Sequence, residues 1–355
     1  MTNPADPAPG VAAEALSGRT LDGDWLVGER IPAVPGATGG TFSVSYRVTD
    51  GSGIPAFLKA LDYSRALQMP NTVNALQILI NAYVYERDLV IRCADAKLSH
   101  VVKALAHGEV SVPGYAPLDK VNYLIFEAGD GDVRRHIDLA TTFDLAWRLR
   151  ALHHIALGLQ QLHGQGIVHR DVKPSNIVVV DGHTAKVADL GRAAQHGFHD
   201  PYAETAYAGD PTYAPIETLY GMRIADARVC GRSCDLYHLG SMTLFLFACA
   251  STTPAVEAVL DPIYRWGTWG GPYAEVLPYL RSAFTQVCDD LRMVTPVAIA
   301  DAVVRLFREL CDPDPVMRGN PKQAESTLVR LNVQRYVSAF DLLARRLEID
   351  MKMKL

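Results

Sequence analysis

The chain has 355 residues, of which 49% are hydrophobic and 21% are charged, so it can form one large domain or two ordinary domains with a sizeable core. Its net charge is −5 at pH 7 and its Lys and Arg residues are dispersed, which excludes a nucleic-acid footprint and a polybasic membrane anchor. The cysteines are dispersed as well, and the one close pair, Cys230 and Cys234, has no second pair at zinc-ligand spacing. We therefore expect buried, reduced thiols rather than a zinc site.

The first segment, residues 1–20, is expected to be a flexible tail. Residues 1–10 are rich in proline and lack the basic-then-apolar pattern of a secretory signal. The most apolar helix candidate, residues 236–250, is too short to span a bilayer. Both observations predict a cytoplasmic protein without a membrane segment.

A small, mostly antiparallel sheet with one helix is predicted for residues 25–127. Residues 42–48 alternate apolar and polar side chains as a half-exposed strand does, and residues 50–53 read D-G-S-G, a hairpin signal. In the next strand, residues 56–61, Lys59 lies among apolar neighbours. The same region is predicted to contain a helix at residues 73–94 and strands at residues 101–110 and 123–127.

Helices dominate the chain after residue 131. Apolar residues recur every three or four positions from 149 to 162, which is typical of a helix packed on one side, and Gly164 and Gly166 end it. Short strands are predicted at residues 177–180 and 186–188. From residue 217 the pattern is one of helices and loops, and a last helix at about residues 323–346 is expected to pack on this region.

The most informative segment runs from His169 to Asn176 and reads H-R-D-V-K-P-S-N. The carboxylate of Asp171 can accept or orient the proton of an attacking hydroxyl group, and the cation of Lys173 can neutralise charge that grows on a transferred phosphoryl group. The amide of Asn176 and the carboxylate of Asp189 supply the oxygen ligands that Mg²⁺ prefers. These residue types in this order are typical of phosphoryl transfer.

Together with D-L-G at residues 189–191 and A-P-I-E at residues 214–217, this segment resembles the catalytic loop, metal loop and substrate-loop end of eukaryotic-like (Hanks-type) Ser/Thr protein kinases. The resemblance runs from about Trp25 to Arg318 and looks like that of a soluble bacterial-type member. It implies an α+β, two-lobed protein kinase fold, with a small β-rich N-lobe that has one main helix and a larger, mostly helical C-lobe. The implied parts are a tail (1–20), the N-lobe (21–128), the C-lobe (129–321) and a C-terminal helix packed on the C-lobe (322–355).

A glycine-rich turn precedes the Lys59 strand, where the family has G-x-G-x-x-G. In the family, backbone amides approach the ATP phosphates there, and side chains would obstruct them. Aligned on Phe42, the three glycine positions fall on Thr38, Gly40 and Ser43, so only the second glycine is retained. The resemblance implies ATP contacts at Thr38, Gly39, Gly40 and Ser43.

Lys59 matches the lysine with which the family holds the α- and β-phosphates of ATP, and a glutamate on the following helix would hold its ammonium group. We assign this glutamate to Glu86, with Asp88 as the alternative, because the intervening stretch is longer than usual. Phe57 stands where the family has the alanine that covers adenine. By resemblance to the family's hinge, the nucleotide is also expected to contact Phe126 as the gatekeeper, Glu127, Ala128 and, through its ribose, Asp132.

The resemblance assigns Arg170 to a phosphate on the activation segment, which would order the substrate platform. Thr205 is the preferred phosphorylation site, and the alternative is a segment that is ordered without phosphorylation. The residues from His196 to Asp200, in the same segment, are interpreted as solvated loop residues rather than metal ligands. All candidates for phosphorylation are Tyr202, Thr205, Tyr207 and Thr212.

Supporting residues are expected outside the catalytic loop. By resemblance, Glu217 forms a buried ion pair with Arg318, and Asp235 braces the backbone of the catalytic loop. Asp210 replaces the threonine that bridges the catalytic Asp and Lys in the family, and a carboxylate there adds like-charge repulsion to Asp171. This departure concerns substrate preference more than catalysis.

We expect an ATP- and Mg²⁺-dependent Ser/Thr protein kinase, with Mn²⁺ as an alternative metal, that acts on protein substrates and phosphorylates itself through transient self-association. No nucleic-acid or membrane partner is expected. The incomplete glycine-rich turn, Phe57 and Asp210 favour a nucleotide-binding pseudokinase scaffold as the alternative. A small-molecule kinase of the aminoglycoside type is a third hypothesis, against which Arg170 and the Glu217–Arg318 pair argue.

Overall fold

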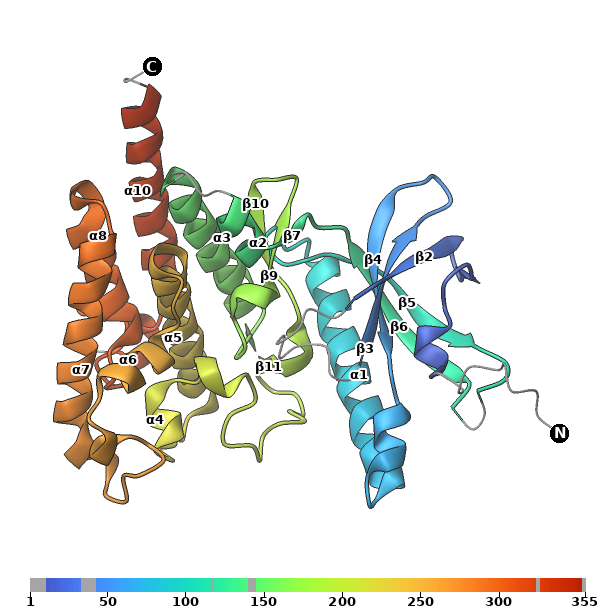
Figure 1. Cartoon of the computed structure of the whole chain (residues 1–355), viewed down its shortest axis with the longest axis horizontal. Coiled ribbons are helices and arrows are strands. Elements are labelled where there is room, and N and C mark those ends of the chain that lie inside the picture. The colour runs from blue at the N-terminus through green and yellow to red at the C-terminus, as the bar shows by residue number, and fades with distance from the viewer. Residues whose placement is uncertain (1–10, 33–42, 116–117, 140–144, 324–325, 353–355) are drawn as a thin grey trace. The chain divides into compact units, whose positions relative to one another are not determined.

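The computed structural model describes residues 11–32, 43–115, 118–139, 145–323 and 326–352. The chain divides into two compact units, Met1–Asp130 and Gly131–Leu355 (Figure 1). The first unit is a β-sheet with one long helix, and the second is mostly helical. The predicted α+β fold, with a β-rich first part and a helical second part, is confirmed.

In the described part of the first unit, six strands form a sheet in the order β1-β2-β3-β4-β6-β5, and all neighbouring strands are antiparallel. The long helix α1 (Thr72–Asp95) begins after Asn71, whose side-chain oxygen accepts a hydrogen bond from the backbone N–H of Asn74 (3.1 Å). Short 3₁₀ turns are η1 (Ala12–Glu14) and η2 (Ser64–Gln68). The strands are β1 (Thr20–Leu21), β2 (Trp25–Ile31), β3 (Ser43–Thr49), β4 (Pro55–Leu61), β5 (Ala104–Ser111) and β6 (Lys120–Glu127).

Successive side chains along each strand point to opposite faces of this sheet. Tyr46 of β3, Leu58 of β4 and Ile125 of β6 are direct neighbours in the register and are all fully buried in one cluster. Lys59, the next residue after Leu58, therefore points to the opposite face. On that face it reaches a glutamate of α1, so the apolar cluster and the lysine lie on different sides of the sheet.

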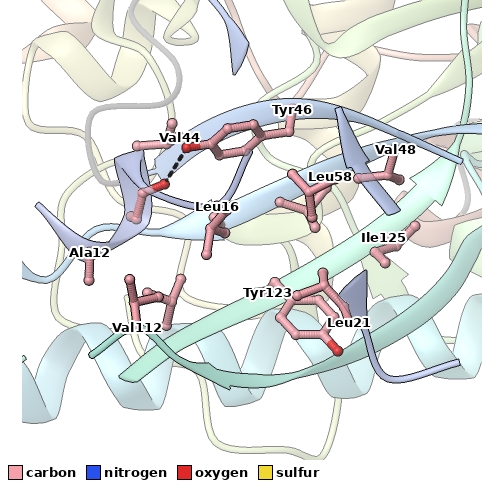
Figure 2. Packing of buried hydrophobic residues seen from close by; sticks show 14 of the residues in the cluster. Ala12, Leu16, Leu21, Val44, Tyr46, Val48, Leu58, Val112, Tyr123 and Ile125 are labelled. Atoms are coloured by element: carbon pink, nitrogen blue, oxygen red, sulfur yellow. Dashed lines mark hydrogen bonds between the residues drawn. The ribbon is translucent and has the colours of Figure 1, made fainter. Parts of the chain in front are cut away.

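The N-terminal segment covers the apolar face. Ala13, Leu16 and Leu21 are buried in the cluster that contains Tyr46, and the Tyr46 hydroxyl donates to the carbonyl oxygen of Ala13 (2.7 Å; Figure 2). The prediction of a flexible tail up to residue 20 is therefore wrong for residues 11–20. The physical reason is that one short helical turn brings small and apolar side chains onto a sheet face that would otherwise remain in water. Residues 1–10 lie outside the described residues.

The described part of the second unit contains helices and two small sheets with the strand orders β10-β9-β7 and β11-β8. The strands are β7 (Gly131–Asp132), β8 (Ile167–Val168), β9 (Ile177–Val180), β10 (Thr184–Val187) and β11 (Ala194–Gln195). The helices are α2 (Val133–Leu139), α3 (Leu145–Gly164), α4 (Ile216–Leu219), α5 (Ala227–Ala248), α6 (Thr252–Val259), α7 (Tyr273–Val294), α8 (Val297–Cys311), α9 (Thr327–Arg330) and α10 (Gln334–Lys352). The 3₁₀ turns are η3 (Pro174–Asn176), η4 (Leu190–Arg192), η5 (Pro211–Tyr213) and η6 (Pro262–Tyr264).

Helix α5 is the central element of this unit, and most of its residues from Gly231 to Phe247 are buried. A Cβ atom at Gly240 would lie 2.3 Å from the sulfur of Cys311, so only glycine permits this close approach of α5 to α8. The apolar run at residues 236–250 is thus a core helix. Among the described residues, no single helix has the length and apolar character to cross a membrane, although α5 and α6, bent by 75° at their junction, pass this test as a pair.

The C-terminal region differs from the single helix predicted at residues 323–346. Helix α9 ends at Arg330, and α10 begins only at Gln334, whose backbone N–H donates to the side chain of Asn332 (2.9 Å). This local bond favours a new helix start over continuation. Helix α10 packs along α3 (Figure 1), and Arg150 of α3 pairs with Asp341 (2.6 Å) and Glu348 (2.7 Å) of α10.

Candidate active site

The first unit brings Lys59 and Glu86 together. The ammonium nitrogen of Lys59 lies 2.8 and 3.1 Å from the two carboxylate oxygens of Glu86, and the Glu86 side chain is only 9% exposed. The alternative acid, Asp88, pairs with Arg87 instead (2.7 Å). The longer stretch before Glu86 is occupied by η2 and the first turns of α1, so the extra residues lengthen the helix and do not displace the pair.

Two aromatic residues lie on the same sheet face as Lys59. Phe57 is two residues before Lys59 and directly opposite Phe126 of β6, so the two rings are cross-strand neighbours. Glu127 at the end of β6 accepts a hydrogen bond from the backbone of Lys103 through its carboxylate (2.7 Å). Ala128 follows β6 and Ser43 opens β3. The remaining turn residues, Thr38, Gly39 and Gly40, lie outside the described residues.

In the second unit, Asp132 on β7 is engaged with Arg134. Its carboxylate accepts the Arg134 backbone N–H (2.9 Å) at the start of α2, and the two side chains form an ion pair (2.6 Å). The hydrogen bond to the Asp132 carboxylate also raises the pKa of the Arg134 guanidinium. A ribose contact at Asp132 would have to share these oxygens and stays a prediction.

The carboxylate of Asp171 is buried and is held from three directions. One oxygen accepts the backbone N–H of Asp210 (2.8 Å). The other lies 3.2 Å from the Lys173 ammonium and 3.1 Å from the amide nitrogen of Asn176. Burial raises the pKa of Asp171, and the Lys173 charge and the Asp210 N–H oppose this shift. Lys173 and Asn176 of the motif therefore meet the backbone of Asp210 around a single carboxylate.

Asp235 of α5 binds the backbone of this loop. Its two oxygens accept the backbone N–H groups of His169 (2.9 Å) and Arg170 (2.8 Å), and the ring of His163 donates to it (2.8 Å). Burial opposes ionisation of Asp235, but the hydrogen bonds and the His163 ring outweigh it and keep its pKa below the usual value. Arg170 has the left-handed backbone angle φ = 64°, so this bracing holds a strained residue in place.

Asn176 and Asp189 lie at adjacent strand ends. Ile177 of β9 pairs with Val187 of β10, and the backbone N–H of Ala188 donates to the carbonyl oxygen of Asn176 (2.8 Å). The Asn176 amide nitrogen donates to Asp171, and its oxygen, which accepts one long hydrogen bond from the Ser175 hydroxyl (3.4 Å), is the atom that can ligate a cation. One amide and one carboxylate oxygen fit Mg²⁺, which takes its other ligands from phosphates and water.

No other metal centre is indicated by the part of the chain that the structure describes, where no group of three or more His, Cys, Asp or Glu side chains could hold an ion. The cysteines there are free thiols. The expectation that the close pair is buried is wrong for Cys230, which is exposed, whereas Cys234 is buried.

Asp210 places a second carboxylate next to Lys173. The Lys173 ammonium lies 3.2 Å from an oxygen of Asp171 and 3.4 Å from one of Asp210, so one cation is shared by two acids. Gly209 is required just before it. A Cβ atom at this position would lie 2.5 Å from the carbonyl oxygen of Arg170 and 2.8 Å from an Asp171 oxygen. The segment thus approaches the catalytic loop too closely for any side chain.

Glu217 and Arg318 form a buried, two-pronged ion pair. The two guanidinium nitrogens donate to the two Glu217 oxygens at 2.7 and 2.8 Å, and Arg318 is fully buried. Arg318 also donates to the Ser233 hydroxyl (2.9 Å) and to the Asp312 carbonyl oxygen (3.0 Å). The carboxylate keeps the pKa of Arg318 above its ordinary value despite burial, so the group stays charged.

Residues 40–325 match the family model that describes the protein kinase domain. The chain belongs to the protein kinase family. Similar curated proteins include a probable serine/threonine-protein kinase of Dictyostelium discoideum, 28% identical over 48% of this chain and 18% of that protein. The hormonally up-regulated neu tumor-associated kinase of Mus musculus is 24% identical over 85% of this chain and 43% of that protein. A calcium/calmodulin-dependent protein kinase kinase of Caenorhabditis elegans is 31% identical over 42% of this chain and 27% of that protein. The chain spans less than half the length of each of these relatives.

The four candidate phosphorylation sites of this kinase differ in exposure. Thr205 and Thr212 are exposed, whereas Tyr202 and Tyr207 are partly buried. The Thr205 hydroxyl donates to the Tyr202 carbonyl oxygen (2.6 Å), and the Thr212 hydroxyl donates to Asp210 (2.6 Å). Burial raises the pKa of Tyr207 well above its ordinary value. Exposure therefore favours the two threonines.

Two polar residues of the kinase were not singled out from its sequence. His238 of α5 accepts the Val172 backbone N–H at one ring nitrogen (3.3 Å) and lies 2.8 Å from the Tyr207 hydroxyl at the other. Burial lowers the pKa of His238 to about 4, so the ring is neutral. A signal was present, since His238 is three positions after Asp235 and shares its helix face.

The second residue is Asp200. The interpretation of this stretch as solvated loop is wrong for Asp200, which forms an ion pair with Arg170 (2.7 Å) and is only 19% exposed. Nothing local in the sequence marks this acid, because its partner lies thirty positions earlier.

Proposed function

We propose that this chain transfers the γ-phosphoryl group of ATP to Ser and Thr hydroxyl groups of proteins. The observation that carries the proposal is the Asp171 carboxylate, which is held by Lys173, Asn176 and the backbone of Asp210. A carboxylate fixed in this way can act on one defined proton, and a cation beside it favours the transfer of a negatively charged group.

Asp171, Lys173 and Lys59 have different roles in the proposed reaction. The acceptor hydroxyl oxygen forms a bond to the γ-phosphorus, the bond from that phosphorus to the β–γ bridging oxygen breaks, and the hydroxyl proton moves to an Asp171 oxygen. Lys173 neutralises charge on the transferred group. Lys59, held by Glu86, binds the α- and β-phosphates.

Asn176 and Asp189 would hold Mg²⁺, or Mn²⁺ in its place. A bound divalent cation would neutralise phosphate oxygens and orient them for displacement. The nucleotide base and sugar would contact Phe126, Glu127, Ala128 and Asp132, and the glycine-rich turn would contact the phosphates. This assignment follows the resemblance of each position to the family motif.

We also propose that the kinase phosphorylates its own activation segment in transient pairs of molecules. Thr205 is the preferred acceptor, since its side chain is exposed and its hydroxyl is bonded only locally, to the Tyr202 carbonyl among the contacts described above. An exposed hydroxyl can enter the active site of a second copy. The physiological substrates would be other proteins.

A pseudokinase scaffold is the competing function. Asp210, which shares the Lys173 cation, and Phe57, which adds an aromatic ring beside Phe126, are the observations that favour it. Both changes leave the side chains that would act in transfer in place. Lys59 still pairs with Glu86, and Asp171 still contacts Asn176. We therefore favour the active enzyme.

Turnover of Mg²⁺-ATP by the purified chain tests the proposal, with peptides that carry Ser, Thr or Tyr acceptors. We compare the wild type with Asp171→Asn, which removes the carboxylate charge, and with Asp301→Asn as a matched surface control, whose side chain is 88% exposed. Loss of the carboxylate is expected to lower kcat by about 10²–10⁴-fold. The control is expected to keep wild-type activity.

Mass spectrometry of the same samples locates any self-phosphorylation. Phosphate on Thr205 that is absent from Asp171→Asn supports a self-phosphorylating Ser/Thr kinase. ATP binding by the wild type without transfer to itself or to any peptide would support the scaffold instead. Transfer to small amino sugars but not to peptides would support the small-molecule kinase.

A further inference from the structure

The guanidinium group of Arg170 is surrounded by acceptors from the activation segment. One terminal nitrogen donates to an Asp200 oxygen at 2.7 Å, and the other donates to the second Asp200 oxygen at 2.9 Å. The inner nitrogen donates to the carbonyl oxygen of Arg192 (2.9 Å), and a longer contact reaches that of Ala193 (3.3 Å). The planar fork of the arginine is thus matched by a carboxylate in the two-pronged geometry that also suits phosphate.

We propose that Asp200 is a built-in substitute for an activation-segment phosphate, a positioning residue that orders the segment around Arg170 without phosphorylation. The proposal rests on the proposed kinase function, whose active site it would position. It decides between the two alternatives that the sequence left open for Arg170. It also gives Asp200 a function that its position in a long loop does not indicate.

The carboxylate of Asp200 is itself fixed by its own segment. The Asp200 oxygen that lies 2.9 Å from an Arg170 nitrogen also accepts the backbone N–H of Tyr202 (2.9 Å), and this bond forms a tight turn. The guanidinium of Arg192 lies over the ring of Tyr202, 4.6 Å from its centre. The stretch from Arg192 to Tyr202 therefore closes on Arg170 from both ends, and the Asp200 and Arg170 side chains are only 19% and 17% exposed.

Arg170 transmits this ordering to the catalytic residue. It directly precedes Asp171 in the chain, its backbone has the strained angle φ = 64°, and its N–H is held by Asp235 (2.8 Å). Strand β11 of the activation segment pairs with β8 just before the catalytic loop, with Ala194 opposite Val168. Because the loop is held by a few specific contacts at a strained residue, loss of one contact is expected to displace the Asp171 carboxylate.

A phosphate at Thr205 would find the arginine already paired. Thr205 is exposed and its hydroxyl is bonded to the Tyr202 carbonyl oxygen, whereas the Arg170 fork is filled by Asp200. A phosphate brought to the same guanidinium would also meet the like charge of Asp200. Phosphorylation at Thr205 would therefore report that the enzyme is active rather than make it active.

The test compares Asp200→Asn with the wild type after both full-length proteins are treated with a phosphatase and shown to be phosphate-free by mass spectrometry. Asparagine keeps the shape of the side chain but removes its charge. Asp301→Asn, which breaks an exposed Arg–Asp pair in the same unit, is the matched control. Asp200→Glu keeps the carboxylate and is the conservative variant.

Two quantities are measured on these four proteins. The first is hydrogen exchange of residues 190–210, which reports order of the segment whether or not a substrate is turned over. The second is kcat and KM for ATP and peptide. We expect Asp200→Asn to exchange at least about tenfold faster in this segment and to lose at least about tenfold in kcat, with KM for ATP unchanged. Phosphate-free wild type, Asp200→Glu and the control should keep a protected segment.

Two results would overturn the proposed role of Asp200, and a third would separate it from the proposed kinase function. If the phosphate-free wild type has an unprotected segment that becomes protected only on phosphorylation, Asp200 does not replace the phosphate. If Asp200→Asn exchanges and turns over like the wild type, the pair has no positioning role. If the wild type is inactive but its segment loses protection in Asp200→Asn alone, the kinase proposal fails while the assignment of Asp200 stands.

Discussion

The buried Glu217–Arg318 pair permits a quantitative prediction about stability. In Arg318→Met the methionine retains an apolar side chain but removes the guanidinium group, so the Glu217 carboxylate, which is 4% exposed, loses its partner inside the protein. The Ser233 hydroxyl and the Asp312 carbonyl oxygen lose a donor as well. Removal of one partner of a buried ion pair costs about 3–5 kcal/mol, because the other charge remains buried without compensation.

The magnitude can be checked in a second way. Two hydrogen bonds to a charged group, at 2.7 and 2.8 Å, are lost, and each contributes about 1.5–3 kcal/mol. Their sum overlaps the range for a broken buried pair. For a unit of this size, 1 kcal/mol shifts Tm by about 2–4 °C, so a decrease of roughly 6–20 °C is expected.

Urea denaturation followed by tryptophan fluorescence measures this change in the appropriate unit, since Trp147, Trp266 and Trp269 are in the second unit and only Trp25 is in the first. Arg292→Met, which removes one partner of the exposed pair with Asp301, should leave the midpoint almost unchanged.

Replacing both partners, in Glu217→Leu with Arg318→Met, should cost less than the sum of the two single changes, with a coupling of about 1–3 kcal/mol. The reasoning is refuted if Arg318→Met unfolds within about 1 kcal/mol of the wild type, or if the two single effects simply add.

Four further substitutions probe other parts of the molecule. Gly209→Ala would bring a Cβ atom within 2.8 Å of an Asp171 oxygen, so kcat should fall by about 10²-fold, whereas KM for ATP should change little. Leu16→Ala should destabilise the first unit by about 2–5 kcal/mol, measured by denaturation, and Tyr46→Phe by about 0.5–1.5 kcal/mol, because the N-terminal segment is part of the core. The pKa of His238 is lowered from 6.5 to about 4 by burial, so its stabilising contribution is complete above pH 6.5 and is lost as pH falls towards 4. This contribution is at most about 3 kcal/mol, and denaturation of His238→Asn between pH 4 and 7 should show a flatter pH dependence than the wild type.

How much of the site follows from the sequence depends on how local each contact is. Asp171, Lys173 and Asn176 lie within six positions, so a single turn suffices to bring them together. The Lys59–Glu86 pair could be proposed because the strand pattern around the lysine and the helix pattern around the glutamate were both clear. The acidic partner of Lys59 was assigned to Glu86 with Asp88 as the alternative. A helix pattern indicates which face of the helix is buried more reliably than which residue on it meets a given partner.

Contacts made by irregular segments could not be predicted in this way. The N-terminal residues up to 20 have no long periodic pattern, yet Leu16 is fully buried, because a three-residue turn suffices to place it on the sheet. Similarly, the start of α10 at Gln334 depends on one side chain, Asn332, that interrupts an otherwise helical pattern. In both places short-range polar or apolar contacts override the pattern that a longer window would indicate.

Two acids of the activation segment, Asp200 and Asp210, act on the same part of the molecule. Asp200 pairs with Arg170 and Asp210 with Lys173, so two cations of one loop each receive a carboxylate from one segment. Both pairs are largely shielded from water, and their attraction is therefore weakened by salt much less than that of surface pairs. Under the proposed role of Asp200, a segment held by its own carboxylates would need no added charge to be ordered. Such a kinase would be controlled by access of its substrate or by its amount in the cell, rather than by phosphorylation of its activation segment.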